Sequence, residues 1–330
     1  MSSLVVQQRL IRGKFTMKVF KAGAAAAVAV VLSLTATACG GGGDKAGDTG
    51  ASGGNKIVIG IKFDQPGLGL KNPDGKFSGF DVDVATYVAK ELGYQPDQIE
   101  FKQAVSAERE NLISNGDVKL VVATYTINDK RKAKVDFAGP YFLAHQDLLV
   151  RADDNSITKA EDLNKKKLCS VTGSTSAQNV KNKLAPEADL QQLGGYSECL
   201  TGLENGSVDA LTTDNSILAG YAAQEKNKGK FKLVGLKLSD EPYGIGLKKG
   251  DKDLQTKVNA ALKKMVEDGS WQKAVDANLG PAGYKAEPVY VYKRQVTGGG
   301  APYRPSWGER RATCSTFLLP GSTTCSEPSG

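Results

Sequence analysis

The sequence predicts an α/β fold with a mainly parallel β-sheet in the body of the chain, residues 56–288. Short apolar runs alternate there with segments whose apolar residues recur at helical spacing, and this alternation is typical of βαβ units. The body is also long enough to form one large lobe or two moderate ones. It contains no short-period internal repeat, so a repeat architecture is not expected.

The first part of the body predicts three strands and two helices. The run IVIGI at 57–61 predicts a strand. Asp81 is expected to cap a helix whose apolar face includes Val84 and Val88 and which ends at Gly93. The other elements expected here are a strand at 99–103, a helix at 108–115 and a strand at 118–123.

The second part of the body continues the same alternation. Strands are expected at 168–171, 190–193, 208–213 and 231–234, with helices from Ser176, over 196–205 and from Asp214 through 223. A strand-like segment at 243–247 and two helices at 252–267 and 271–278 complete the body.

Residues 1–38 are expected to form an export signal. Lys18 and Lys21 precede an apolar run over 22–34, and small residues follow at 36–38. The apolar run is too short for a membrane-spanning helix and ends in a cleavage-type sequence. Met17 fits such a signal better as a start than Met1 does.

Cys39 directly follows the small residues, as the lipid-modified cysteine of bacterial lipoproteins does. The similarity implies a mature protein that is exported and held by its lipid at the outer face of the cell membrane. The alternative is an ordinary secretory cleavage with an incidental cysteine. The Gly-rich remainder of 39–55 predicts a flexible linker.

The other end of the chain, 289–330, predicts a disordered or non-native tail. It is rich in Gly, Pro, Ser and Thr and lacks any helical or strand period, although Cys314 and Cys325 could pair there. The formal net charge of +7 arises in 1–38 and in this tail, so the body is close to neutral. A near-neutral body argues against nucleic-acid binding.

The stretch ATYTINDKRKAKVDFAGPY, residues 123–141, predicts a carboxylate-binding site. Thr124 and Thr126 stand at an expected strand end, Arg131 follows them, and an aromatic loop is expected at 137–142. The planar fork of an arginine matches the two oxygens of a carboxylate and makes charge-assisted hydrogen bonds. The alternative is a solvated arginine in a basic run.

The second part of the body offers the complementary chemistry. Residues 173–176, GSTS, lie between an expected strand and a helix, so their N–H and hydroxyl groups can form an anion-binding nest. Asp214 stands at a second strand-to-helix junction. Plain helix N-caps are the alternative at both places. Arg131 and Asp214 together suit an α-amino acid, because a buried zwitterion needs a partner for each charge.

Several ordered segments together resemble the polar amino-acid-binding proteins of bacterial ABC importers, the extracellular solute-binding proteins of family 3. The similarity is greatest to glutamate-type members from actinobacteria and covers roughly residues 56–288. The segments are IGIKFDQPGLGL (59–70), GFDVDVATYVAKELGY (79–94), ATYTINDKRKAKVDFAGPY (123–141), VTGSTSAQ (171–178), NGSVDALTTDNSILAGY (205–221) and EPYGIGLKKGD (241–251).

This resemblance implies a two-lobe "flytrap" fold of the type II periplasmic-binding-protein kind, with two crossover hinge strands. Lobe 1 would comprise 56–150 and 243–288, and lobe 2 would comprise 151–242. The lobes would close around one amino acid by a hinge at 150–153 and 240–243. A membrane permease would then receive the ligand. We expect a monomer without a cofactor.

The resemblance also implies roles for individual residues. Arg131 would bind the ligand α-carboxylate, with help from the N–H and hydroxyl groups of Thr124, Thr126 and Thr175. Ser174 belongs to the same loop as Thr175. Asp214 would accept hydrogen bonds from the α-ammonium group. Both Thr124 and Thr126 stand where many relatives have serine, so the hydroxyl is kept.

Lys62 and its neighbour Phe63 follow the first expected strand, where the family often places a group that matches the ligand side chain. A lysine there would pair with a side-chain carboxylate, which favours glutamate, then aspartate, then glutamine or asparagine. The alternative is a solvent-facing lysine at the rim of the cleft. Gln65 and Arg109 are weaker candidates of the same kind.

Cys169 and Cys199 are expected to form a disulfide, because an exported protein meets an oxidising environment. Closing a loop of this length would stabilise the fold by about 3–4 kcal/mol on the chain-entropy model. The alternative is two reduced, buried thiols. The single histidine, His145, is expected to be structural or close to the hinge.

An enzyme is the main rival from another class. One histidine and five scattered cysteines give neither a Ser-His-Asp set nor a metal-binding spacing, and the chain has no Walker-type phosphate loop. A few relatives on this scaffold, however, are dehydratases of prephenate-like acids that use an acidic residue in the cleft. A sensor module for a separate membrane receptor is a second rival.

Overall fold

The computed structural model describes residues 56–286. The expected signal peptide at 1–38, the expected lipidation site Cys39 with its linker to 55, and the predicted tail at 289–330 with Cys314 and Cys325 lie outside the described residues. Within 56–286, no helix is both long and apolar enough to cross a membrane.

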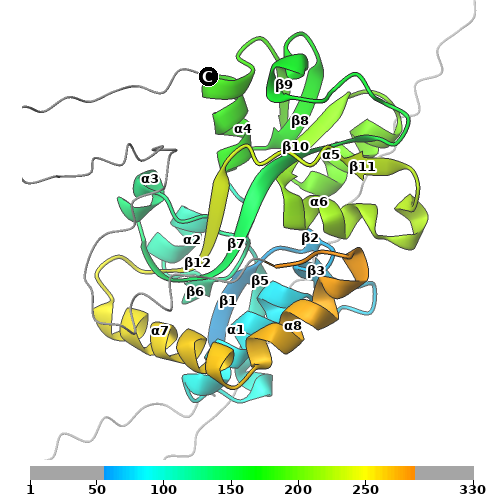
Figure 1. Ribbon diagram of the computed structural model, residues 1–330. Helices are drawn as coiled ribbons and strands as arrows, with labels where there is room; N and C mark the ends of the chain where they lie inside the picture. The colour runs from blue at the N-terminus through cyan, green and yellow to red at the C-terminus, as the bar shows by residue number, and fades with distance from the viewer. Residues whose placement is uncertain (1–55, 287–330) are drawn as a thin grey trace, which may run out of the picture. The chain divides into compact units, whose positions relative to one another are not determined.

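The described residues form a mixed α/β structure whose larger sheet has nine strands (Figure 1). Its strands pair in the order β5-β1-β6-β12-β7-β10-β8-β9, with β11 also paired to β7. A small second sheet has the order β2-β3-β4. The strands are β1 (Ile57–Ile61), β2 (Asp64–Gln65), β3 (Gly69–Lys71), β4 (Phe77–Ser78), β5 (Ile99–Gln103), β6 (Leu120–Val121), β7 (Asp136–Arg151), β8 (Lys167–Val171), β9 (Asp189–Leu193), β10 (Ala210–Asp214), β11 (Phe231–Leu233) and β12 (Asp240–Leu247).

Two lobes share this sheet. The first lobe holds β1, β5 and β6 and the second holds β8–β11, and the pairs β1–β5, β1–β6, β8–β9 and β8–β10 are all parallel. This confirms the mainly parallel, two-lobe α/β fold. Because parallel neighbours need a crossover, helices connect the strands within each lobe. The helices are α1 (Phe80–Glu91), α2 (Arg109–Ser114), α3 (Asp129–Lys132), α4 (Thr175–Asn179), α5 (Tyr196–Glu204), α6 (Asn215–Ala222), α7 (Lys252–Glu267) and α8 (Ser270–Asn278).

The long strand β7 belongs to both lobes (Figure 1). Its first part, Asp136 to His145, pairs antiparallel with β12. Its second part, Gln146 to Arg151, pairs antiparallel with β10 and β11. The sequence analysis expected an aromatic loop at 137–142, and this was wrong. Phe137 and Phe142 are buried in the strand, and such burial on both faces removes the alternating pattern by which a strand is recognised.

Most of the other expected elements are confirmed within two residues, but two details differ. Strand β6 is shorter than the expected 118–123. Asp81 is not the N-cap of α1, because the helix begins after Gly79. Gly79 has φ of 124°, and a Cβ there would lie 2.1 Å from the carbonyl oxygen of Leu68. Only glycine fits that close approach, and Asp81 is left fully buried for another purpose.

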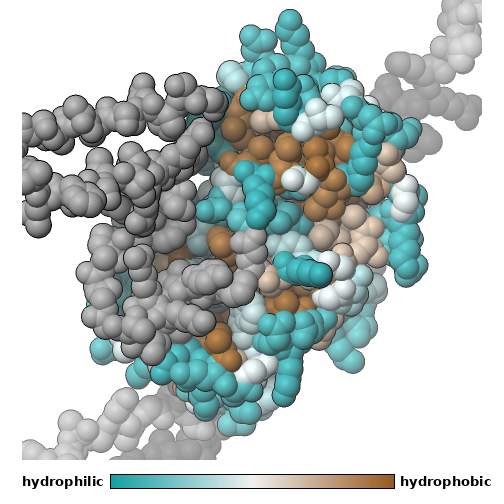
Figure 2. Space-filling view, in the orientation of Figure 1, coloured by the Kyte–Doolittle hydropathy of each residue, from teal (hydrophilic) through white to brown (hydrophobic). Residues whose placement is uncertain are grey.

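The core runs through both lobes. Its largest cluster includes Phe80, Phe142 and Tyr243 and extends to the buried disulfide. Cys169 on β8 and Cys199 on α5 form that bond, as expected. Smaller clusters lie under β6 in the first lobe and under β7, β10 and β8 in the second. On the face seen in Figure 2, hydrophilic side chains cover the outward sides of the helices, and apolar ones gather over the second lobe.

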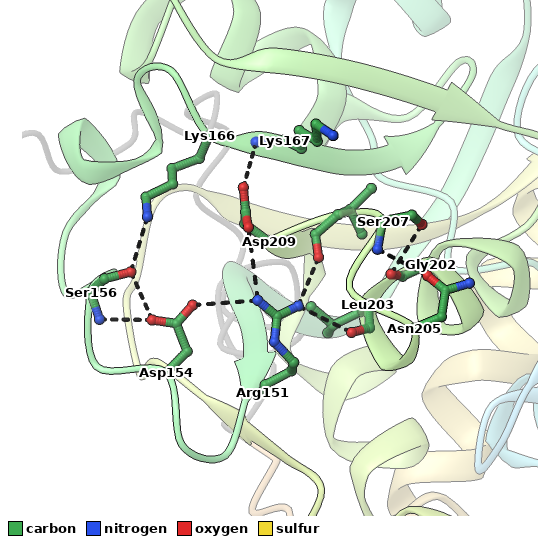
Figure 3. Close-up of polar contacts among 11 residues, drawn as sticks. Arg151, Asp154, Ser156, Lys166, Lys167, Gly202, Leu203, Asn205, Ser207 and Asp209 are labelled. Atoms are coloured by element: carbon green, nitrogen blue, oxygen red, sulfur yellow. Dashed lines mark hydrogen bonds and ion pairs between the residues drawn. The ribbon is translucent and has the colours of Figure 1, made fainter.

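Arg151 fixes the edge of the second lobe where β7 ends (Figure 3). Its Nη1 donates to the carbonyl oxygens of Leu203 at 3.2 Å and Val208 at 2.9 Å. Its Nη2 lies 3.9 Å from a carboxylate oxygen of Asp154 and 3.8 Å from one of Asp209. One guanidinium therefore joins the end of α5, the loop after it and the turn after β7, which explains why this arginine is not part of the ligand site.

Candidate functional site

A narrow cavity lies between the two lobes. Polar and charged side chains line most of it, and each lobe contributes five of the ten lining residues. Since a cavity walled by charged groups of both signs is unfavourable for apolar ligands, it suits a small polar or zwitterionic molecule. The lining residues are Ser106, Arg109, Thr124, Thr126, Arg131 from the first lobe and Ser174, Thr175, Tyr196, Asp214, Ile217 from the second.

Arg131 enters this cavity from the one-turn helix α3. Asn128 caps that helix, since its side chain accepts the Arg131 backbone N–H at 2.9 Å. The guanidinium is buried and donates to the carbonyl oxygens of Thr126 at 2.7 Å and of Gly173, in the opposite lobe, at 3.1 Å. The alternative of a solvated arginine in a basic run is therefore wrong. The guanidinium therefore joins the two lobes. A ligand carboxylate could accept the hydrogen bond that Arg131 now donates to the Gly173 carbonyl.

Thr124 and Thr126 both line the cavity, but their polar groups are already engaged. The Thr124 N–H donates to Asp81 at 2.8 Å, and its hydroxyl donates to the Gln65 side chain at 3.2 Å. Thr124 has φ of 44°, which the bonds to buried groups hold in place. Asp81 also accepts from the Tyr141 hydroxyl at 2.7 Å, so this carboxylate shapes the site from behind.

Glu241 is a buried carboxylate that the sequence analysis did not identify. It lies on β12, and its Oε2 accepts the hydroxyls of Thr126 at 2.7 Å and Thr175 at 2.8 Å, which come from opposite lobes. Its Oε1 accepts the Ser239 hydroxyl at 2.6 Å. The two threonine hydroxyls therefore face Glu241 here. The segment EPYG was part of the resemblance, but nothing in one sequence shows where its glutamate points.

Asp214 ends β10 and occupies the N-cap position of α6, yet its side chain makes no capping bond within 56–286. Its Oδ2 instead accepts the Tyr243 hydroxyl at 2.6 Å, and Asp214 itself lines the cavity. Burial, followed by the nearby Glu241 carboxylate, raises the pKa of Asp214 above its ordinary value. A cationic ligand group beside Asp214 would relieve both effects, because it stabilises the ionised carboxylate.

Ser174 and Thr175 stand in the loop after β8. The Ser174 hydroxyl accepts the Ala177 N–H at 3.0 Å and is the N-cap of the short helix α4. The plain N-cap alternative is therefore what the structure shows for Ser174, although the residue also lines the cavity. Gly173, with φ of 80°, turns the chain before it.

Lys62 is buried and donates to the hydroxyl of Ser106, a residue of the cavity lining, at 2.8 Å. The alternative of a solvent-facing lysine is therefore wrong. Burial, together with the Arg109 and Arg131 guanidinium groups, lowers the pKa of Lys62 to about 7, while Asp64 and Asp214 oppose this shift. A lysine that is costly to keep charged gains from any anion placed beside it.

Arg109 is a second buried guanidinium in the cavity wall. Its Nη1 donates to the carbonyl oxygens of Ala123 at 3.0 Å and Thr124 at 3.3 Å, and its Cζ lies 4.2 Å from the Tyr125 ring centre. Its Nε has no hydrogen-bond partner within 56–286. Burial and the charge of Arg131 lower the pKa of Arg109 to about 10. The Nε is thus a buried donor available to a ligand.

The remaining candidates lie outside the cavity lining. Phe63 is half-buried and packs on Phe77, with ring centres 4.9 Å apart. Gln65 is fully buried, and its Nε2 has no partner within 56–286. His145 lies on the shared strand β7, with its Nδ1 3.0 Å from Asp240 on β12. Within the same range, no group of three or more His, Cys, Asp or Glu could hold a metal.

The fold and the cavity define a class: a two-lobe binding protein whose polar site lies between the lobes. The comparisons agree with this. Residues 57–281 match the model of the bacterial extracellular solute-binding proteins, family 3. The chain belongs to this family.

Individual relatives carry amino-acid-binding names. The chain is 50% identical over 234 residues to the glutamate-binding protein GluB of Corynebacterium glutamicum. The aligned region covers 68% of this chain and 78% of that protein. It is 44% identical over 221 residues to the ABC transporter glutamine-binding protein GlnH of Bacillus subtilis, covering 66% and 79%. A solved structure of an ancestral arginine-binding protein bound to arginine is 36% identical, with a TM-score of 0.64, covering 68% and 98%. These are proteins that bind solutes, and the chain is a substrate-binding protein of an amino-acid ABC transporter.

The burial of Lys62 predicts a pH-dependent gain in stability when its charge is removed. Burial holds the pKa of Lys62 near 7 in the folded state, against 10.5 in the unfolded chain. The loss of stability caused by burying the charged lysine is therefore complete below pH 7 and disappears as the pH rises toward 10.5. Lys62→Met should raise the unfolding free energy of the ligand-free protein at pH 6.5 by about 1–4 kcal/mol. The gain should shrink by pH 10, as measured by urea unfolding.

The matched control is Lys76→Met, since the Lys76 side chain is 83% exposed. It should change stability little at either pH. If Lys62→Met destabilises the protein at pH 6.5 as much as at pH 10, the lysine is not held at a cost.

Proposed function

We propose that this protein captures an acidic amino acid, glutamate before aspartate, and glutamine or asparagine after them, by closure of its lobes. The observation that carries the proposal is the opposed pair of buried charges in one cavity. Arg131 reaches it from the first lobe and Asp214 from the second. The α-carboxylate would bind Arg131, and the α-ammonium would bind Asp214. A bound zwitterion thereby compensates both groups and joins the lobes.

The side chain of the ligand would extend toward the cations of the first lobe. Lys62 and Arg109 are both buried there, and the Arg109 Nε has no protein partner within the described residues. A second carboxylate would offset the repulsion among three buried cations. A neutral amide would leave that repulsion in place, which is why glutamate and aspartate precede glutamine. The printed names of the relatives, glutamate-binding and glutamine-binding, support the same range.

Closure would take place about the two strands that join the lobes. We propose lobe 1 at 56–150 and 243–288 and lobe 2 at 151–242, with hinges at 150–153 and 240–243. The register of β7, which changes partners from β12 to β10 at Gln146, supports a change of lobe along that strand. Glu241 lies in the second hinge and receives hydroxyls from both lobes, so it would hold the closed form.

The site is assigned accordingly. Thr124, Thr126, Ser174 and Thr175 would complete the shell around the α-carboxylate. Phe63 would pack behind Lys62. The expected product of binding is a closed monomer that docks on a membrane permease and releases the amino acid there.

Export and anchoring belong to the same proposal. The signal-like segment at 1–38 and Cys39 support a lipid-anchored protein at the outer face of the membrane. Cys39→Ala should then release the protein from the membrane fraction into the soluble fraction of cells that express it, because the lipid is attached to that thiol. Cell fractionation measures this, and a variant that stays with the membrane would contradict lipid anchoring at Cys39.

Loss of the Arg131 guanidinium should abolish high-affinity capture. Arg131→Ala leaves the α-carboxylate buried without its partner, so the affinity for glutamate should fall at least ~30-fold, and up to ~1,000-fold or more. Titration calorimetry measures this directly. Lys130→Ala, at the exposed neighbour, should bind as the wild type does.

If wild-type protein binds no amino acid, the proposed ligand class is wrong, and conversion of prephenate or arogenate becomes the assay of choice. Recovery of a receptor or kinase as partner, with no permease, would favour the sensor role.

Lys62 is expected to govern the choice of side chain. Lys62→Met should lower the affinity for glutamate and aspartate by about tenfold to a hundredfold and leave the affinity for glutamine nearly unchanged, since only the acidic ligands lose an ion pair. Competition calorimetry with the three ligands measures the ratio. Equal losses for glutamate and glutamine would assign Lys62 to the general architecture of the cavity.

A further inference from the structure

Three glycines of the second lobe lie directly against the chain of the first lobe. A Cβ placed on Gly173 would lie 2.8 Å from the Cα of Ala107. One on Gly195 would lie 2.8 Å from the Asp64 carboxylate, and one on Gly220 would lie 2.1 Å from the carbonyl oxygen of Pro66. Real Cβ atoms do not approach other heavy atoms that closely. At Gly173 and Gly220 the neighbouring atom is backbone, so these two contacts require a residue without a side chain, whereas at Gly195 it is the movable end of the Asp64 side chain.

These contacts surround the ligand cavity. Ser174, Tyr196 and Ile217 line the cavity, and each lies within three residues of one of the three glycines. In Figure 1, strand β2 of the first lobe lies beside α5 and α6 of the second, where two of the contacts form. The Tyr221 hydroxyl also donates to the carbonyl oxygen of Asp64 at this edge. The glycine contacts therefore belong to the same interface between the lobes that holds the cavity.

Gly220 is the clearest of the three, because its own conformation does not call for glycine. It lies inside α6, and its φ is outside the left-handed region. In the interior of a helix, alanine is more favourable than glycine by about 1 kcal/mol. The helix alone would therefore prefer alanine at 220, and the reason for glycine lies in the opposite lobe.

The carbonyl of Pro66 cannot easily retreat from a larger residue. A hydrogen bond from the Leu68 N–H to the Gln65 carbonyl oxygen, at 3.1 Å, closes the turn that carries it. The N–H groups of Phe80 and Asp81 donate to the carbonyl oxygens of Gly67 and Leu68, respectively, at 3.0 Å each. Gly67 in the same turn lies against the end of α8, where a Cβ would be 2.9 Å from the Asn278 carbonyl oxygen. The turn is therefore fixed to α1 and α8 of the first lobe.

We propose that Gly220 is the closure contact of this protein: its missing side chain lets the Pro66 turn seat on α6, and this seating sets the ligand affinity. The inference rests on the proposed capture by lobe closure. In the open form the two surfaces separate, and the size of residue 220 is of no consequence. In the closed form a methyl group at 220 collides with a fixed backbone oxygen, so the closed state alone loses stability.

Alanine substitutions at Gly195 and Gly220 should reduce the ligand affinity to different extents. Gly195 faces the end of the Asp64 side chain, which can rotate aside, so Gly195→Ala should have a small effect. Gly220 faces a backbone carbonyl, so Gly220→Ala should have a large one. Gly194, next to Gly195, has only Glu198 of its own lobe near its Cβ position, at 3.4 Å, and provides the matched control.

The test uses the full chain and glutamate as the probe, with titration calorimetry and small-angle X-ray scattering. Gly220→Ala should reduce the glutamate affinity by roughly tenfold to a hundredfold and should abolish the decrease in radius of gyration that glutamate causes in the wild type. Its ligand-free melting temperature should stay the same or rise, because α6 gains an alanine. Gly194→Ala should match the wild type in all three measurements.

Each other outcome has a definite meaning. If the wild type does not bind glutamate, the proposed ligand fails, and the titration and scattering comparison is made with whichever amino acid binds. If the wild type binds and contracts but Gly220→Ala behaves identically, the closure contact is refuted while the capture function stands. A ligand-free Gly220→Ala that melts well below the wild type would show that Gly220 serves the fold, and this too would overturn the inference.

Discussion

The cost of burying charge is the constraint on which this site depends. Lys62, Arg109 and Arg131 lie with Asp214 and Glu241 in and around one narrow cavity, and all five are almost completely removed from water. A charge in such a place is tolerated only with a partner of opposite sign or with good hydrogen bonds. The surrounding carbonyls and hydroxyls satisfy these groups in part. Groups that stay unsatisfied within the described residues, such as the Arg109 Nε, would contribute to affinity if a ligand supplied their missing partner.

The sheet turns this local constraint into a relation between two lobes. The strand β7 pairs with β12 along one part and with β10 along the other, so it links the two lobes on which the cation and the anion stand. A ligand with both charges gains most when the lobes meet. Glu241 and the glycine contacts act on the same motion, one by hydrogen bonds to both lobes and the other by permitting close backbone approach.

The sequence predicted the alternating elements well, because amphipathic helices such as α7 and short apolar strands such as β1 carry clear periods. It failed at β7, whose two buried faces leave no alternation, and at Asp81, whose burial depends on the distant Thr124 and Tyr141. Arg131 and Asp214 were predictable from local junctions and from the family resemblance. Glu241 was not, because its three hydroxyl partners come together only through the fold.

A crystal structure of the protein with bound glutamate would test the central claim most directly. The account predicts one glutamate between the lobes, with its α-carboxylate on Arg131, its α-ammonium on Asp214 and its side-chain carboxylate toward Lys62 and Arg109. A glutamate bound in the reverse orientation, or bound outside this cavity with Arg131 still on the Gly173 carbonyl, would contradict the account.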